Sequence, residues 1–140
     1  MKIDYNLQFN KNNKLQHFLN IENLSKEHIN EIIDLADNYI NNTSNKFKDL
    51  EGKTIASLFF EPSTRTKTTF ELASKRLSAD FINIDIANSS TLKGESILDM
   101  IKTLEAMECD MFIVRHSSSG TPHYIAKEVG NKISVINAGD

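Results

Sequence analysis

Hydrophobic and polar positions alternate between residues 53 and 137 in a way that predicts strands and helices in turn. Short apolar runs, typical of buried strands, occupy residues 53–60, 81–86, 110–115 and 133–137. Between these runs, apolar residues recur at helical spacing, which predicts helices from residue 63, over 96–107 and over 121–130. This order predicts an α/β fold: a parallel sheet of about four strands with helices on both faces, in three layers.

Residue choice at the helix ends supports these assignments. Before the last predicted strand, Thr121 is expected to cap a short helix that has Pro122 at its first position and Gly130 after its end. An earlier helix is predicted within residues 22–41, with Ser25 as its cap. Its apolar face is expected to meet the core or another surface, and consists of Ile29, Ile32, Ile33, Ala36 and Ile40.

The N-terminal region differs in composition from the rest of the chain. Residues 1–50 hold 11 of the 15 Asn residues. Such a composition is typical of an arm that is irregular or loosely held.

Composition and charge narrow the class of protein. A length of 140 residues with 39% hydrophobic and 25% charged residues predicts one globular domain over residues 1–140. A net charge of −3 disfavours nucleic acid as a partner. The start of the chain has no apolar signal region, so neither secretion nor a membrane is indicated, and we expect a cytoplasmic protein. The single cysteine, Cys109, is expected to be buried and inert.

The most informative segment lies where the first buried strand turns into a helix. Ser63, Thr64, Arg65 and Thr66 place hydroxyls and a guanidinium at the helix N-terminus. Free backbone N–H groups and the positive end of the helix dipole favour an anion there, and arginine can bind two phosphate oxygens. The alternative is a plain helix cap followed by a surface arginine.

Two other segments carry candidate residues. Arg115 ends a strand and should emerge at the same sheet edge as Arg65, although a solvated arginine, or one that pairs with a helix, is an alternative. His116 beside it is either an acid or base or, more commonly for such a position, a structural hydrogen-bonding group. The loop with Ser90 and Lys93 could reach an anion or be an ordinary polar loop.

Several chemistries lack their sequence signatures. The four histidines have neither the spacing nor the cysteine partners of a zinc site, so no metal site is predicted. GxSxG, GxGxxG and GxxxxGK[ST] are also missing, so we predict no serine hydrolase, dinucleotide site or P-loop.

The segment from Phe59 to Glu71, centred on Ser-Thr-Arg-Thr at 63–66, resembles the carbamoyl-phosphate motif of the aspartate and ornithine carbamoyltransferases. The likeness extends over nearly the whole chain except the N-terminal arm. Residues 22–41 resemble the family's first helix, and Lys93-Gly94-Glu95 resembles its Lys-Gly-Glu loop. Arg115-His116 and Asn137 to Asp140 resemble its Arg-His pair and its Asn-Ala-Gly-Asp strand end.

Lys93 implies the aspartate branch of this family, because the ornithine enzymes lack that lysine. The resemblance then implies transfer of a carbamoyl group from carbamoyl phosphate to L-aspartate, giving N-carbamoyl-L-aspartate and phosphate in pyrimidine biosynthesis without a cofactor. It also implies a homotrimer formed through this domain. Regulatory or dihydroorotase-like chains are candidate further partners that the sequence does not identify.

The resemblance implies a role for each site residue. Ser63, Thr64, Arg65 and Thr66 would hold the phosphate, and Thr66 and Arg115 would polarise the carbonyl. Lys93 and Ser90, or Ser89 if the alignment shifts by one residue, would enter the site from the adjacent subunit, where Lys93 would also contact aspartate. Glu61 resembles a glutamate that pairs with arginines in the closed form. Lys67 stands where many relatives have arginine.

The family pattern continues beyond Asp140 with a His-Pro-x-Gln segment and an aspartate-binding domain, neither of which is in these 140 residues. We therefore expect a fragment of a longer chain that is inactive by itself. The alternatives are a short, non-catalytic assembly subunit related to the family and, less favoured because of Lys93, an ornithine carbamoyltransferase.

Overall fold

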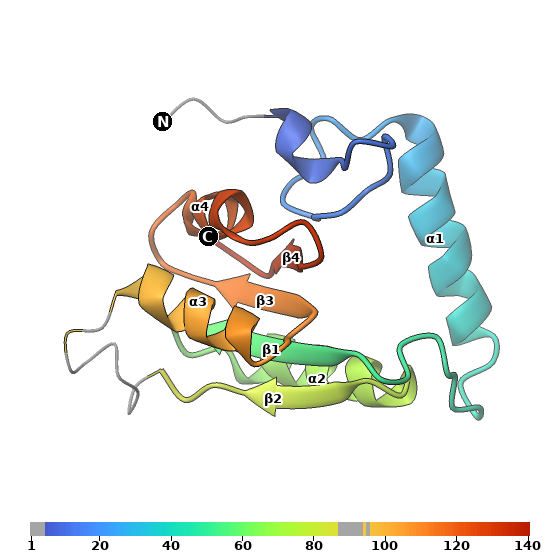
Figure 1. Ribbon diagram of the computed structural model, residues 1–140. Coiled ribbons are helices and arrows are strands. Elements are labelled where there is room, and N and C mark those ends of the chain that lie inside the picture. The colour runs from blue at the N-terminus through green and yellow to red at the C-terminus, as the bar shows by residue number, and fades with distance from the viewer. Residues whose placement is uncertain (1–4, 87–93, 95) are drawn as a thin grey trace.

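The computed structural model describes residues 5–86, 94 and 96–140 (Figure 1). The elements run in the order η1 (Tyr5–Gln8), α1 (Lys26–Ile40), β1 (Thr54–Phe59), α2 (Thr64–Arg76), β2 (Asp80–Asn83), α3 (Ile97–Ala106), β3 (Met111–Arg115), α4 (Thr121–Glu128) and β4 (Ser134–Asn137). The predicted alternation of strands and helices is confirmed. No helix in the described part of the chain is both long and apolar enough to cross a membrane.

The strands form one parallel sheet in the order β2-β1-β3-β4. The chain passes from β1 through α2 to β2 on one side, and then through α3 back to β3 on the other side of β1 (Figure 1). The connection therefore changes direction between β1 and β3, where open α/β sheets bind ligands at the carboxyl ends of the strands. The register places Phe59 beside Arg115 at this point.

Alternate side chains of the central strands enter two hydrophobic clusters, one on each face of the sheet. Ile55, Phe59 and Ile113 join the first cluster, against which Phe70 of α2 packs. The second cluster contains strand residues together with residues of α3 and α4: Ala56, Leu58, Phe112, Val114, Ile101, Leu104 and Ile125. Burial of both sheet faces explains the nearly continuous apolar runs in β1 and β3. The three-layer arrangement is confirmed.

Strand β2 is shorter than predicted and begins one residue earlier. It spans Asp80–Asn83 rather than 81–86. As an edge strand it pairs with β1 alone, and Ile82 is 40% exposed. The apolar pattern over 81–86 therefore overestimated the length of the strand. The paired register ends at Asn83, and the Ile84 N–H makes one more hydrogen bond, to the Ser57 carbonyl, while Ile84 and Ile86 pack against the core.

The N-terminal arm is irregular, but the prediction that it is loosely held is wrong for the described residues. Phe18 forms a parallel bridge with Ile136 of β4, and the Leu19 N–H donates to the Gln8 Oε1 atom at 2.7 Å. Gln8 and His17 are buried, at 2% and 5% exposed, as is Leu19. The arm thus adds to the β4 edge of the sheet through backbone and side-chain hydrogen bonds that composition does not reveal.

Helix α1 lies to one side of the sheet (Figure 1), and none of its residues is buried. Its predicted cap is confirmed, because Ser25 Oγ accepts a hydrogen bond from the His28 N–H. Its apolar face does not belong to the core of the described chain: Ile33 is 51% and Ile40 64% exposed. Of the two predicted roles for this face, the core role is therefore wrong, and contact with another surface stays a prediction.

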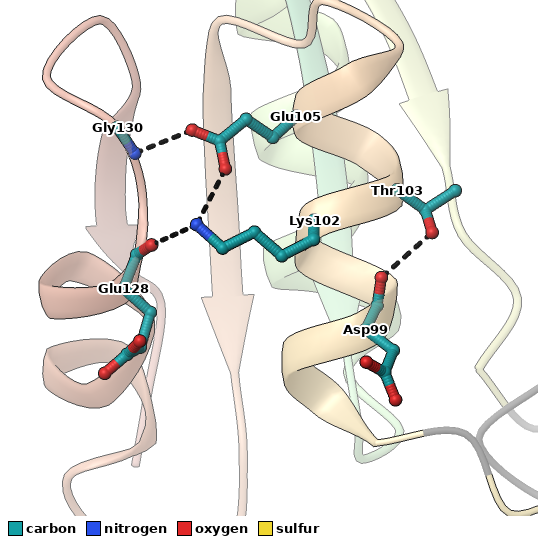
Figure 2. A network of polar contacts seen from close by, with 6 residues as sticks. All are labelled: Asp99, Lys102, Thr103, Glu105, Glu128 and Gly130. Atoms are coloured by element: carbon teal, nitrogen blue, oxygen red, sulfur yellow. Dashed lines mark hydrogen bonds and ion pairs between the residues drawn. The ribbon is translucent and has the colours of Figure 1, made fainter.

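The start of α4 corrects another prediction. Thr121 is the first helical residue rather than the cap, which is Gly120 in the left-handed region with φ of 87°. The Thr121 hydroxyl donates instead to the Ser118 carbonyl. After the helix, the Gly130 N–H donates to Glu105 Oε1 on α3, and Lys102 joins Glu105 to the Glu128 carbonyl (Figure 2). These contacts tie the end of α4 to α3.

Candidate functional site

The N-terminus of α2 presents free hydrogen-bond donors at the switch point between β1 and β3. The first backbone hydrogen bond of the helix runs from the Lys67 N–H to the Ser63 carbonyl, so the N–H groups of Thr64, Arg65 and Thr66 precede the helical ladder. Ser63 occupies the cap position, yet its side chain makes no capping hydrogen bond. Ser63 therefore does not cap the helix through its side chain, and its hydroxyl forms no hydrogen bond with the described residues, whereas the exposed Arg65 fits the surface arginine of the plain-cap alternative.

Arg65 and Thr66 differ in exposure. Arg65 is exposed, and its guanidinium forms no ion pair with any residue in the described ranges. Its backbone carbonyl accepts the Thr69 hydroxyl, which fixes the first turn of the helix rather than the side chain. Thr66 is half-buried. The helix start thus combines an unpaired cation with partly shielded N–H and hydroxyl donors.

Arg115 lies at the end of β3, in register with Phe59 at the end of β1. Its Nε donates to Glu61 Oε1 at 2.7 Å, and its Nη1 donates to the Ala138 carbonyl at 3.0 Å. The solvated alternative for this arginine is therefore wrong: the side chain is 30% exposed and its direction is fixed by two partners. Glu61 immediately precedes Pro62 and Ser63, so the ion pair joins Arg115 to the segment that begins α2.

The segment after β4 completes the support of Arg115, and sequence reasoning missed this contribution. Gly139 has a φ of 137°, and a Cβ atom there would lie 2.7 Å from Arg115 Nη1. Gly139 also accepts the His116 N–H on its carbonyl. The available signal was a glycine directly after a strand at the functional edge of the sheet. Three strand ends, those of β1, β3 and β4, therefore meet at Arg115.

His116 has a structural role as a hydrogen-bonding group, the more common of the two alternatives for a histidine at this position. Its Nδ1 accepts the Ser118 N–H at 2.8 Å, and its ring packs on Phe60 with a centroid separation of 4.8 Å. Both contacts fix the loop after β3.

Other predicted residues lie apart from this edge or outside the described ranges. Ser89, Ser90 and Lys93 fall among residues 87–93, which the structure does not describe. Cys109 is buried at 4% exposed, as predicted. Burial, and secondarily the charge of Asp110, raises the pKa of its thiol, which disfavours the reactive thiolate.

The arrangement suits an anion whose charge changes during reaction. Donors from one helix start and a guanidinium from the neighbouring strand are held on rigid elements before any ligand arrives. Such preplaced groups stabilise negative charge without the cost of reorienting solvent. The site contains no side chain placed as a nucleophile among its described residues, and the geometry instead favours binding and polarising an anionic substrate.

Comparison with known proteins agrees with this description. Residues 16–140 match the family described as aspartate/ornithine carbamoyltransferase, carbamoyl-P binding domain. The catalytic subunit of M. jannaschii aspartate transcarbamoylase is 37% identical, with a TM-score of 0.78 over 90% of this chain and 41% of the other. Aspartate transcarbamoylase from Trypanosoma cruzi, solved with carbamoyl phosphate and aspartate, is 29% identical, with a TM-score of 0.80 over 89% of this chain and 41% of the other.

A chain with this sheet, helix start and arginine is a carbamoyl-phosphate-binding domain of the transcarbamoylase fold. The chain belongs to the aspartate/ornithine carbamoyltransferase family, and the solved structures that it resembles are aspartate transcarbamoylases. It spans about two fifths of the length of those structures.

Proposed function

We propose that this chain binds carbamoyl phosphate as part of an aspartate carbamoyltransferase, which converts carbamoyl phosphate and L-aspartate to N-carbamoyl-L-aspartate and phosphate. The observation that carries the proposal is the Glu61–Arg115 ion pair, which joins the end of β3 to the segment between β1 and the N-terminus of α2. Ser63, Thr64, Arg65 and Thr66 would hold the phosphate. Thr66 and Arg115 would donate to the carbonyl oxygen.

The reaction explains why cations and N–H donors are needed. When the amine of aspartate attacks the carbonyl carbon, negative charge grows on the carbonyl oxygen. The C–O bond to phosphate then breaks, and charge moves to the departing phosphate. Arg65, which has no competing ion pair among the described residues, would stabilise that leaving group. Arg115 would stabilise the negative charge that grows first, on the carbonyl oxygen.

The wider setting of the enzyme is part of the same proposal. We place it in the cytoplasm, in pyrimidine biosynthesis, as a homotrimer in which Lys93 and Ser90 reach the site of the adjacent subunit. Aspartate would contact that Lys93, and regulatory or dihydroorotase-like chains are further candidate partners. The exposed apolar face of α1 supports assembly with another surface, because solvent-exposed contiguous apolar area is unfavourable.

The 140-residue chain is proposed to be inactive by itself. Its structural relatives are more than twice as long, and the family pattern places a His-Pro-x-Gln segment and the aspartate-binding domain after Asp140. Loss of one oxyanion donor alone costs about 10²- to 10³-fold in rate. Phosphate release by the purified chain that depends on aspartate would contradict this part of the proposal.

The binding step can be tested on the 140-residue chain itself. Carbamoyl phosphate should raise the midpoint of thermal unfolding of the wild-type chain, because a ligand that binds only the folded state stabilises it. Arg65→Ala should remove most of that rise. The matched control is Arg76→Ala, which removes the same charge from the opposite end of α2. An equal rise in Arg65→Ala and wild type would overturn the assigned site.

A further inference from the structure

A cavity of about 440 Å³ lies between the N-terminal arm and the last turn of α4. Its lining includes Asn10, Lys11, His17 and Lys127. Helix α4 begins near Asp140, at the carboxyl ends of the strands, and ends before β4 begins, at the amino ends. The cavity beside its last turn therefore lies at the opposite edge of the sheet from Arg115. It is therefore separate from the site proposed for carbamoyl phosphate, and the inference does not rest on that function.

His17 supplies a fixed donor to this cavity. The residue is 5% exposed, and its Nδ1 accepts the Val135 N–H at 3.0 Å. Burial lowers the pKa of His17 to about 4, so the ring is neutral near pH 7. A neutral imidazole that accepts at Nδ1 carries its proton at Nε2. That N–H has no hydrogen-bond partner among the described residues, although the side chain is more than nine-tenths buried and lines the cavity.

The other polar groups of the cavity also favour a ligand with acceptor oxygens. Asn10 Oδ1 already accepts two backbone N–H groups, those of Asn12 and Lys14, which leaves its Nδ2 group as a donor. Lys11 and Lys127 add two positive charges, and no carboxylate belongs to the described lining. A positive cavity in a chain of net charge −3 is a local feature rather than a consequence of composition.

We propose that this cavity binds a small phosphorylated metabolite: Lys11 and Lys127 would pair with its phosphate, and the His17 N–H and the Asn10 amide would hold its oxygens. The volume is within the range of small-molecule sites, about 300–1,000 Å³, and exceeds the space that a bare phosphate needs. Apolar residues such as Phe9 and Val129 at the same lining suit the carbon skeleton of an organic phosphate.

The test uses ribose 5-phosphate and inorganic phosphate as probes of the 140-residue chain. The titrations are made on the Arg65→Ala variant, in which phosphate binding at the α2 N-terminus is expected to be largely lost. Binding to the cavity is followed through the imidazole signals of His17 by nuclear magnetic resonance. Ribose 5-phosphate should shift those signals and bind more tightly than inorganic phosphate. Lys127→Gln, a change at an exposed residue, should weaken binding by about tenfold, the loss expected for one charge-assisted hydrogen bond.

The control is Lys48→Gln, another exposed lysine that does not belong to the cavity lining and should leave the affinity unchanged. Unshifted His17 signals at millimolar ribose 5-phosphate would overturn the proposal. Equal weakening in the two lysine variants would also overturn it, as would equal affinity for both probes. Repeating the titration in the wild-type chain separates this result from the α2 site, because only the wild type retains Arg65.

Discussion

Arg115 donates from Nε to Glu61 Oε1 at 2.7 Å, which links the end of β3 to the segment between β1 and α2. The carboxylate therefore occupies one edge of the guanidinium, and Glu61 lies two residues before Ser63, where the proposed phosphate site begins. In this arrangement Glu61 holds Arg115 in place and competes with an incoming anion for the same positive charge.

The first prediction concerns this competition. Glu61→Gln keeps the size of the side chain but removes its charge, so carbamoyl phosphate should bind several-fold more tightly in calorimetric titrations. The stability of the chain should change by less than about 1 kcal/mol, because the ion pair is partly exposed. Glu71→Gln, which breaks the surface pair with Lys75, is the control and should not change the affinity. Weaker binding in Glu61→Gln would show that positioning outweighs competition.

The second prediction concerns Gly139. Gly139→Ala should destabilise the chain in urea by about 1–3 kcal/mol, since a φ of 137° strains a residue with a Cβ atom, and the Cβ atom, 2.7 Å from Arg115 Nη1, should push that guanidinium aside. It should also weaken carbamoyl phosphate binding by displacing that arginine. Gly52→Ala is the control for backbone strain alone, because Gly52 has a φ of 79° and no atom within 4 Å of the added Cβ. Similar losses in both variants would argue against the close approach.

The third prediction concerns His17 and pH. Burial lowers its pKa from 6.5 to about 4, so the unfolded chain binds more protons between these values and stability falls as pH falls through that interval. The contribution is at most about 3 kcal/mol. His17→Gln should flatten the free energy of unfolding between pH 6.5 and 4, measured by urea titration. A slope equal to that of the wild type would contradict this assignment.

The fourth prediction concerns the contact between α3 and α4 (Figure 2). Two hydrogen bonds lower the pKa of Glu105 below 4.5: the one from Lys102 contributes most, and the one from the Gly130 N–H contributes less. Its stabilising effect is present above the unfolded value and is lost as pH falls through the lower folded value. Glu105→Gln should remove this acid-sensitive part of stability. An exposed glutamate on α1, changed as Glu31→Gln, is the comparison for urea unfolding below pH 5.

The alternation of strands and helices could be predicted from the sequence alone, as could the sheet edge at which the candidate site lies. The apolar runs of β1 and β3 are long because both faces of the sheet are covered, and the helix start after β1 carries hydroxyls and Arg65. These are local patterns, set by neighbours within a few residues, and they were sufficient to locate the candidate site.

Only the tertiary structure decided the partners of these residues. The pairing of Arg115 with Glu61 and Ala138 joins residues 54 and 23 positions apart, which periodicity cannot predict. The burial of His17 depends on hydrogen bonding to β4, 118 positions away, and the exposure of α1 depends on which surfaces meet it. Local sequence sets the element, but long-range packing sets whether a side chain is buried, paired or free.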